Sequence, residues 1–110
     1  MSYCILTVDG RMYTKLLPAP VQEMQRIVGG YIEVIRLLED LTIYANESGK
    51  LIGAPPNRLA TILYRRIAGD EKIIVGDVIV FGGFTDDGDM IGLSAKRLAS
   101  VQLLQEVKSK

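Results

Sequence analysis

Hydrophobic residues recur along the chain either at every second position or at helical spacing, and the two patterns alternate. Two strand-forming runs, residues 3–8 and 11–17, flank the dipeptide Asp9-Gly10. Both central positions of a type I′ turn need positive φ, which Asp-Gly accommodates, so the sequence predicts a first β-hairpin here. The spacing then changes to that of a helix, which predicts a helix over residues 20–28 that ends at Gly29-Gly30.

The middle of the chain predicts two further strands and a second helix. Residues 31–38 and 41–46 are rich in β-branched, aromatic and other apolar side chains. Turn-forming residues follow, so we expect a second hairpin within residues 41–53 that turns around Ser48-Gly49. Asn57 comes after two prolines and is a good N-cap for a helix over residues 58–67.

The last third of the chain predicts strands at residues 73–75 and 77–82, and a helix over residues 95–107 that is capped by Ser94. The residues of this helix expected to face inward are Leu98, Val101, Leu104 and Val107. The sequence therefore predicts an α+β fold, a single small domain of β-hairpins with three short helices, over residues 1–110.

Charge and composition narrow the range of partners. The chain has 13 basic and 13 acidic residues, and 48% of its residues are hydrophobic. Proteins that grip a nucleic-acid backbone carry a positive excess, so long DNA or RNA is not an expected partner. A neutral chain with this many hydrophobic residues tends to associate, which predicts a homo-oligomer.

The sequence offers little for catalysis. It contains no histidine, so its one cysteine, Cys4, has no histidine to activate it, and we expect that cysteine to be buried. No metal-binding motif and no need for a cofactor is visible. No run approaches the ~20 hydrophobic residues of a membrane span, and no signal peptide is seen, so we expect a cytoplasmic protein that does not contact membranes.

The start of the second predicted helix is the candidate binding site. Pro55 and Pro56 make the segment before the helix rigid. Asn57 carries a side-chain amide, and Arg58 carries a planar guanidinium group with five hydrogen-bond donors. A helix that begins here points backbone N–H groups outward, which suits a phosphate or carboxylate. The sequence therefore predicts a ligand site at Pro56, Asn57 and Arg58. The alternative is that Asn57 only caps the helix and Arg58 is solvated.

Other motifs give weaker evidence for a binding site. The glycine pairs Gly29-Gly30 and Gly82-Gly83 fit no nucleotide fingerprint. The acidic residues 86–89 lack the glutamate that a calcium loop needs at its twelfth position, where Arg97 stands, so we expect a solvated turn and no metal. Among the aromatic residues, Phe84 is the one we expect to stack on a ligand, because two glycines precede it and an acidic turn follows.

Five short motifs in the same order resemble a family of small proteins from bacteriophages, prophages and mobile elements, catalogued as a domain of unknown function. The motifs are Val28-Gly29-Gly30-Tyr31-Ile32-Glu33, Asn46-Glu47-Ser48-Gly49-Lys50-Leu51, Pro55-Pro56-Asn57-Arg58, Val75-Gly76-Asp77-Val78-Ile79-Val80 and Asp89-Met90-Ile91-Gly92-Leu93-Ser94. They span residues 21–95, with the first hairpin and the last helix at or outside the edges of the resemblance.

The resemblance implies a setting among phage accessory genes in a host cell, many of which counter host defence. By analogy with that setting, we expect a non-catalytic protein that sequesters a small phosphorylated ligand, such as a cyclic nucleotide or a cyclic ADP-ribose signal. Two alternatives stay open. One is an inhibitor that binds a host defence enzyme, and the other is a hydrolase that uses paired carboxylates such as Glu33 and Glu47.

Overall fold

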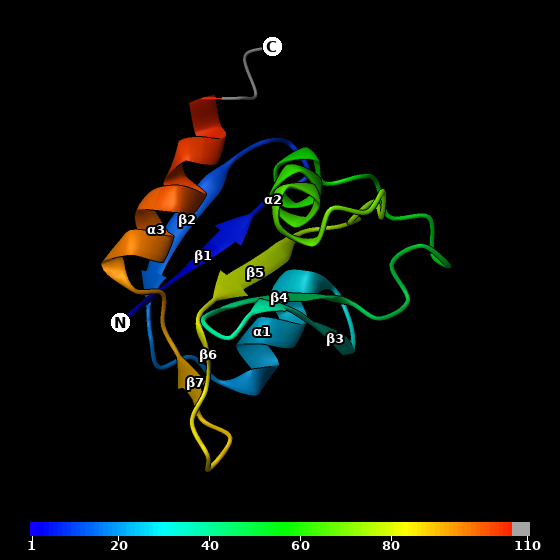
Figure 1. Ribbon diagram of the computed structural model, residues 1–110. Coiled ribbons are helices and arrows are strands. Elements are labelled where there is room, and N and C mark those ends of the chain that lie inside the picture. The colour runs from blue at the N-terminus through cyan, green and yellow to red at the C-terminus, as the bar shows by residue number, and fades with distance from the viewer. Residues whose placement is uncertain (107–110) are drawn as a thin grey trace.

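Five antiparallel strands form the central sheet of the computed structural model, which describes residues 1–106, in the order β2-β1-β5-β4-β3 (Figure 1). The strands are β1 (Ser2–Leu6), β2 (Met12–Leu16), β3 (Ile32–Leu38), β4 (Leu41–Asn46) and β5 (Val78–Phe81). The helices are α1 (Val21–Val28), α2 (Arg58–Ala68), α3 (Ala95–Gln102) and a 3-10 turn η1 (Leu103–Glu106). A second, two-stranded sheet joins β6 (Gly83–Phe84) to β7 (Met90–Ile91). The α+β prediction is confirmed.

Locally encoded elements lie where the sequence predicts them. β1 and β2 pair on either side of Asp9-Gly10, with Leu6 opposite Met12, so the first hairpin is confirmed. Its turn is not type I′, because Gly10 has a positive φ of 85° and Asp9 does not, and Gly10 N donates to Thr7 O at 3.0 Å. α1 ends at Gly29, whose φ of 85° is the left-handed conformation that glycine adopts without strain. The Asn57 and Ser94 side chains accept the capping hydrogen bonds of α2 and α3. The third helix changes to a 3-10 turn at Leu103, and Val107 lies outside the described residues.

The predicted hairpin around Ser48-Gly49 is wrong. Residues 47–53 form successive turns, in which Ile52 N donates to Ser48 O and Ala54 N to Gly49 O at 3.0 and 2.9 Å. The physical reason is that a strand has two hydrogen-bonding edges, and β4 uses one for β3 and the other for β5. The same limit applies to residues 73–75, where the predicted strand is reduced to one bridge between Val75 and Pro56.

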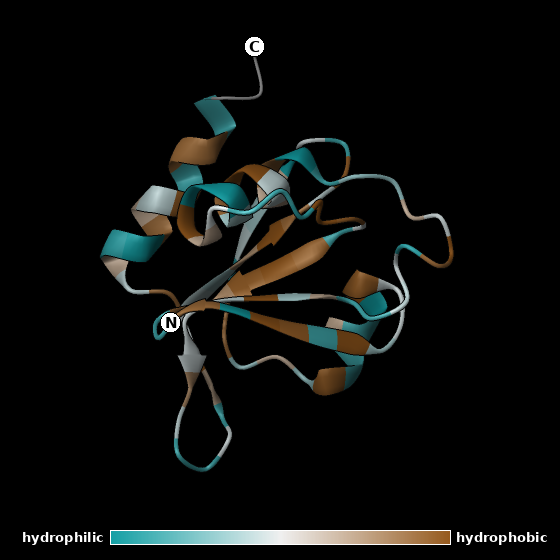
Figure 2. Ribbon diagram, turned by 45° about the vertical axis from the view of Figure 1, so that its right-hand side comes forward, coloured by the Kyte–Doolittle hydropathy of each residue, from teal (hydrophilic) through white to brown (hydrophobic). Residues whose placement is uncertain are grey.

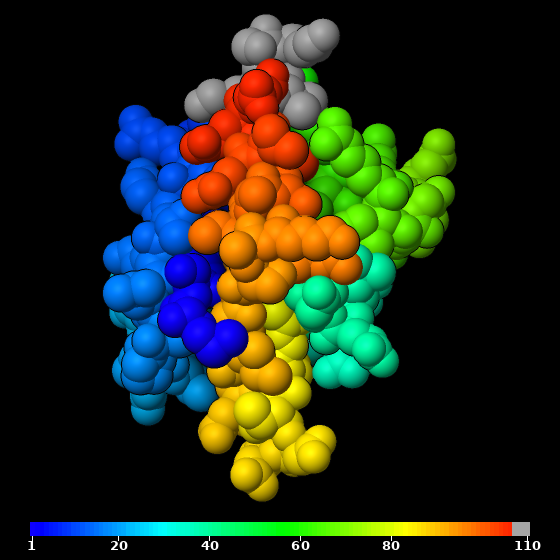
Figure 3. All heavy atoms as spheres, turned by 60° about the vertical axis from the view of Figure 1, so that its left-hand side comes forward, coloured from blue at the N-terminus to red at the C-terminus, as the bar shows by residue number. Residues whose placement is uncertain are grey.

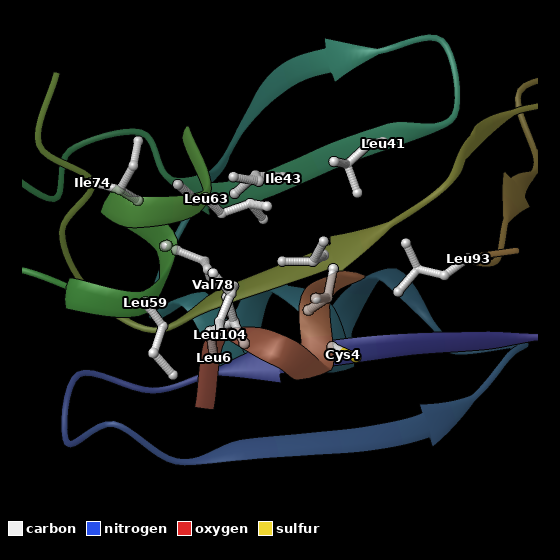
Figure 4. Close-up of a cluster of buried hydrophobic side chains, with 14 residues drawn as sticks. Cys4, Leu6, Leu41, Ile43, Leu59, Leu63, Ile74, Val78, Leu93 and Leu104 are labelled. Carbon is white, nitrogen blue, oxygen red and sulfur yellow. The ribbon is translucent and has the colours of Figure 1, made fainter. Parts of the chain in front are cut away.

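The sheet lies between two helical layers. One hydrophobic cluster packs α2, α3 and η1 on one face, and its members include Leu6, Ile43, Leu63 and Leu104 (Figure 4). A second cluster packs α1 on the other face, through Met24 and Val28 against Ile79 and Phe81. Figure 2 shows α1 across the sheet from α2 and α3, with hydrophobic residues concentrated on the strands between them.

The β6–β7 hairpin extends beyond the body of the molecule (Figure 3). Thr85 N donates to Asp89 O at 2.8 Å and Gly88 N donates to Thr85 O at 2.9 Å, which closes the acidic turn. Residues 85–89 are exposed, as expected for a solvated turn.

Cys4 is fully buried in the cluster beneath α3 and η1, which confirms the prediction from sequence. Burial raises the pKa of the Cys4 thiol, while its contact with the Thr14 hydroxyl acts in the opposite sense. A raised pKa leaves less thiolate near neutral pH, and burial blocks access. We therefore expect a maleimide to label Cys4 slowly in the folded protein and rapidly in urea, as followed by mass spectrometry. Equal rates in both would contradict the buried placement.

Candidate functional site

Asn57 sits inside the molecule and joins three parts of the chain. Its Nδ2 donates to the carbonyl oxygens of Leu6 and Gly76, both at 2.8 Å, and its Oδ1 accepts from Ala60 N at 3.0 Å. Its side chain has no exposed surface. Asn57 therefore ties α2 to the end of β1 and to the segment before β5, and its buried amide is engaged in these contacts.

Pro56 and Arg58 lie on either side of this buried residue and are exposed. Arg58 lines a hollow of about 230 Å³ together with Asp9, Gly10, Val8 and Leu59. The Asp9 carboxylate also lines this hollow, and its Oδ2 is 3.4 Å from the Nε of Arg11. The helix start thus provides a small recess that is lined by both Arg58 and Asp9.

Phe84 lies on the other face of the sheet. Its ring is 5.3 Å from the Phe81 ring and 6.2 Å from the Tyr44 ring, measured between centroids. It borders a separate hollow of about 200 Å³ beside α1, which shares no lining residue with the hollow at Arg58. The structure therefore does not bring Phe84 together with Pro56 and Arg58 in one site.

A hollow of about 450 Å³ lies at the β3 end of the sheet. One wall comes from β3 and β4, the second from the loop after β4, and the third from the segment before β5. Its lining residues are Glu33, Ile35, Ala45, Asn46, Glu47, Lys50, Leu51, Lys72, Ile73, Ile74 and Val75. We call this hollow the β3–β4 cleft.

The loop that forms the second wall is fixed at its base. The buried Asn46 side chain donates from Nδ2 to the carbonyl of Val28 at 3.1 Å, and its Oδ1 accepts from Ser48 N at 2.8 Å. Gly49 packs so closely on the third wall that an added Cβ would come within 2.8 Å of Val75 Cγ2. A glycine is therefore required at that position to hold the two walls together.

Four charged side chains line the β3–β4 cleft, and their formal charges cancel. Lys72 Nζ is 3.7 Å from Glu33 Oε2 and 5.9 Å from the centre of the Tyr64 ring, so two neighbours orient it. Within residues 1–106, neither Glu47 nor Lys50 forms an ion pair. The cleft therefore combines one oriented lysine with two charged groups that are open to a ligand.

The sequence pairs Glu33 and Glu47 as carboxylates, and the structure places both in the β3–β4 cleft. A signal for Glu33 exists in the sequence, because it shares a strand face with Ile35 and Leu37, which pack against the hydrophobic core. A charged residue on an inward face is unusual and marks a possible site. Lys50 and Lys72 were missed, since both lie outside strands and helices, where no periodicity indicates which way they point.

The part of the chain that the structure describes contains neither a metal-binding cluster nor a membrane-spanning helix. No group of three or more acidic or cysteine side chains is placed to hold a metal ion there. No helix within residues 1–106 is both long and hydrophobic enough to cross a membrane.

The model of a family described as "Domain of unknown function (DUF3846)" matches residues 1–107. The match extends beyond residues 21–95, where the motifs of the sequence resemblance lie, and takes in the first hairpin and the last helix. No curated protein and no solved structure matches the chain.

Proposed function

We propose a function from the β3–β4 cleft itself, because the chain belongs to the family described as "Domain of unknown function (DUF3846)", a description that states no activity. The proposal is that the protein binds a small phosphorylated ligand of nucleotide type in this cleft and does not transform it. The ligand class is the one expected from the sequence, whereas the site moves from the start of α2 to the cleft.

One observation carries the proposal: two lysines and two glutamates converge on a cleft with hydrophobic walls. Its volume of about 450 Å³ lies in the range of small-molecule sites, which are concave, mostly apolar and furnished with a few polar groups. The hollows at Arg58 and Phe84 are about half this size or smaller.

The chemistry of the four charged groups suits a phosphorylated nucleoside better than a simple anion. The Lys50 and Lys72 ammonium groups donate to phosphate oxygens. The carboxylates of Glu33 and Glu47 accept hydrogen bonds from ribose hydroxyl or base amino groups. Apolar side chains such as Ile73 contact the base. A bare anion would meet two carboxylates as well as two lysines, so it gains little here.

Binding without turnover is the simpler reading of the chemistry, because the chain contains no histidine and Cys4 is buried away from the cleft. In the phage setting that the sequence resemblance implies, such a protein would sequester an immune signal, which makes cyclic nucleotides and ADP-ribose isomers the first ligands to test. A carboxylate hydrolase stays a second candidate, favoured by the placement of Glu33 and Glu47 in one cleft. Inhibition of a host enzyme is the third.

We expect Lys50→Gln and Lys72→Gln each to weaken binding about ten- to a hundredfold, because a charge-assisted contact to phosphate contributes ~1.5–3 kcal/mol. The measurement is isothermal titration calorimetry with the nucleotide of the panel that raises the melting temperature most. Arg58→Gln is the matched control, since it removes one exposed cation at the alternative site.

The outcomes separate the candidates. A loss of affinity in Arg58→Gln alone would move the site to the start of α2. Mass spectrometry of recovered ligand distinguishes sequestration, in which the ligand is intact, from hydrolysis, in which it is altered. If no member of the panel binds, the nucleotide proposal fails and inhibition of a protein partner becomes the leading candidate.

A further inference from the structure

Exposed hydrophobic side chains lie on the segments that form the β3–β4 cleft and next to them, and we call this group the rim. Tyr31, Leu51, Ile52 and Ile73 are 77%, 89%, 65% and 43% exposed. Leu51 and Ile73 line the cleft itself, Ile52 follows Leu51 at the tip of the loop, and Tyr31 O accepts from Glu47 N at 2.9 Å. Figure 2 shows the hydrophobic stretch at the outer end of the loop between β4 and α2. Gathered hydrophobic surface of this kind marks an interaction site.

The charges within the rim identify the kind of partner. Glu47 and Lys50 stand three residues apart on the same loop, both line the cleft, and neither has an ion-pair partner within residues 1–106. A surface that carries one unpaired charge of each sign is complementary to itself. In a two-fold dimer each residue i meets residue j of the other copy, and each j meets i.

We propose that a second copy of this chain docks on the rim in a two-fold arrangement, with Glu47 of each copy facing Lys50 of the other. The rim side chains of both copies are buried in this dimer, and each loop covers the mouth of the opposite cleft. The dimer deepens the proposed function, and only the enclosure of a ligand rests on that function. Lys50 and Glu47 serve both contacts at once, because an ammonium group has three donors and a carboxylate accepts several hydrogen bonds. The association itself needs no ligand.

Other occupants fit the rim less well. The charges of Glu33, Glu47, Lys50 and Lys72 beside it cancel, so an anionic membrane surface gains no net electrostatic attraction there. A strongly acidic or strongly basic protein would gain no net electrostatic attraction, because the two lysines and two glutamates of the cleft cancel in charge. Two copies of this chain do not repel each other, because the chain has zero net charge.

Charge reversal at Glu47 and Lys50 tests the proposed two-fold dimer. The molecular mass of each variant in solution is measured by sedimentation velocity at several protein concentrations and without ligand. We expect the parent to be a dimer and both Lys50→Glu and Glu47→Lys to weaken association about tenfold or more, because each variant sets like charges opposite each other twice. An equal mixture of the two variants is expected to restore the dimer, since opposite charges then face each other at both contacts. Lys96→Glu, an equal charge change on the exposed face of α3, is the control and is expected to leave association unchanged.

A second variant tests the hydrophobic part of the surface. Leu51→Ser changes a side chain that is almost fully exposed. We therefore expect the melting temperature of the monomer to stay unchanged, while the affinity between the two copies falls. A monomeric parent at high micromolar concentration overturns the proposal, as does a dimer that is indifferent to both charge reversals, or a mixture that fails to restore it. Because no ligand is present, these results are independent of whether the cleft binds a nucleotide.

Discussion

Replacing Asn57 by alanine is expected to lower the free energy of unfolding by about 3–5 kcal/mol, far more than the loss of an ordinary helix cap. A cap alone is worth ~1 kcal/mol. The larger cost arises because the amide of Asn57 also satisfies the carbonyl oxygens of Leu6 and Gly76, at 2.8 Å each. A buried carbonyl left without a donor costs ~1–3 kcal/mol, and the residue is fully buried, so water does not replace the lost amide freely.

Two control variants separate these contributions. Ser94→Ala removes the cap of α3, where the Ser94 hydroxyl accepts from Arg97 N at 3.2 Å on the surface, so we expect a cost of ~1 kcal/mol. Asn57→Asp keeps an oxygen that can cap α2 but removes the Nδ2 donors, so it should be nearly as destabilising as alanine. The measurement is urea unfolding with comparison of midpoints at constant slope. If Asn57→Ala costs no more than Ser94→Ala, the two carbonyl contacts contribute nothing measurable.

The second large effect is expected at Phe81, which is fully buried in β5, between β1 and β4. Its ring is 4.5 Å from the Tyr44 ring and 5.3 Å from the Phe84 ring, and both contacts are edge-on. Phe81→Ala should therefore lower the free energy of unfolding by about 3–5 kcal/mol, because it opens a cavity in the layer between the sheet and α1. Urea unfolding measures this cost directly.

Phe84 supplies the comparison for Phe81. It is half-buried, so we expect Phe84→Ala to cost about half as much, and the double variant to reveal a coupling of about 0.5–1.5 kcal/mol between the two rings. A ligand-stacking residue that is free of the core would show no such coupling. A fall in nucleotide affinity with Phe84→Ala that exceeds any effect of stability would support Phe84 as a binding residue.

The sequence by itself determined the elements whose causes are local. Asp9-Gly10 sets a hairpin, Gly29 ends α1, and Asn57 and Ser94 cap α2 and α3, because each depends on the φ preferences or side-chain reach of a few neighbouring residues. The α+β class follows from the same signals, since runs of strand and helix periodicity are visible without any distant contact.

Tertiary structure alone decided how the strands share their edges. Residues 50–53 and 73–75 have strand-like composition, but β4 and β5 already have a partner on each side, so neither segment pairs with the strand that it follows or precedes. No local property of these residues reveals that the edges are taken. Asn57 illustrates the same limit, because its role as a cap is readable from the sequence and its bonds to Leu6 and Gly76 are not.

Some residues of the candidate site could be predicted from the sequence, and others could not. Glu33 stands out in the sequence as a charge on a strand face otherwise occupied by Ile35 and Leu37. Lys50 and Lys72 belong to irregular segments separated by the whole of α2, so only the packed molecule brings them to one cleft. The sequence thus determined the elements, whereas the packing of distant segments decided which charged groups meet, because a cleft depends on distances in space rather than on positions along the chain.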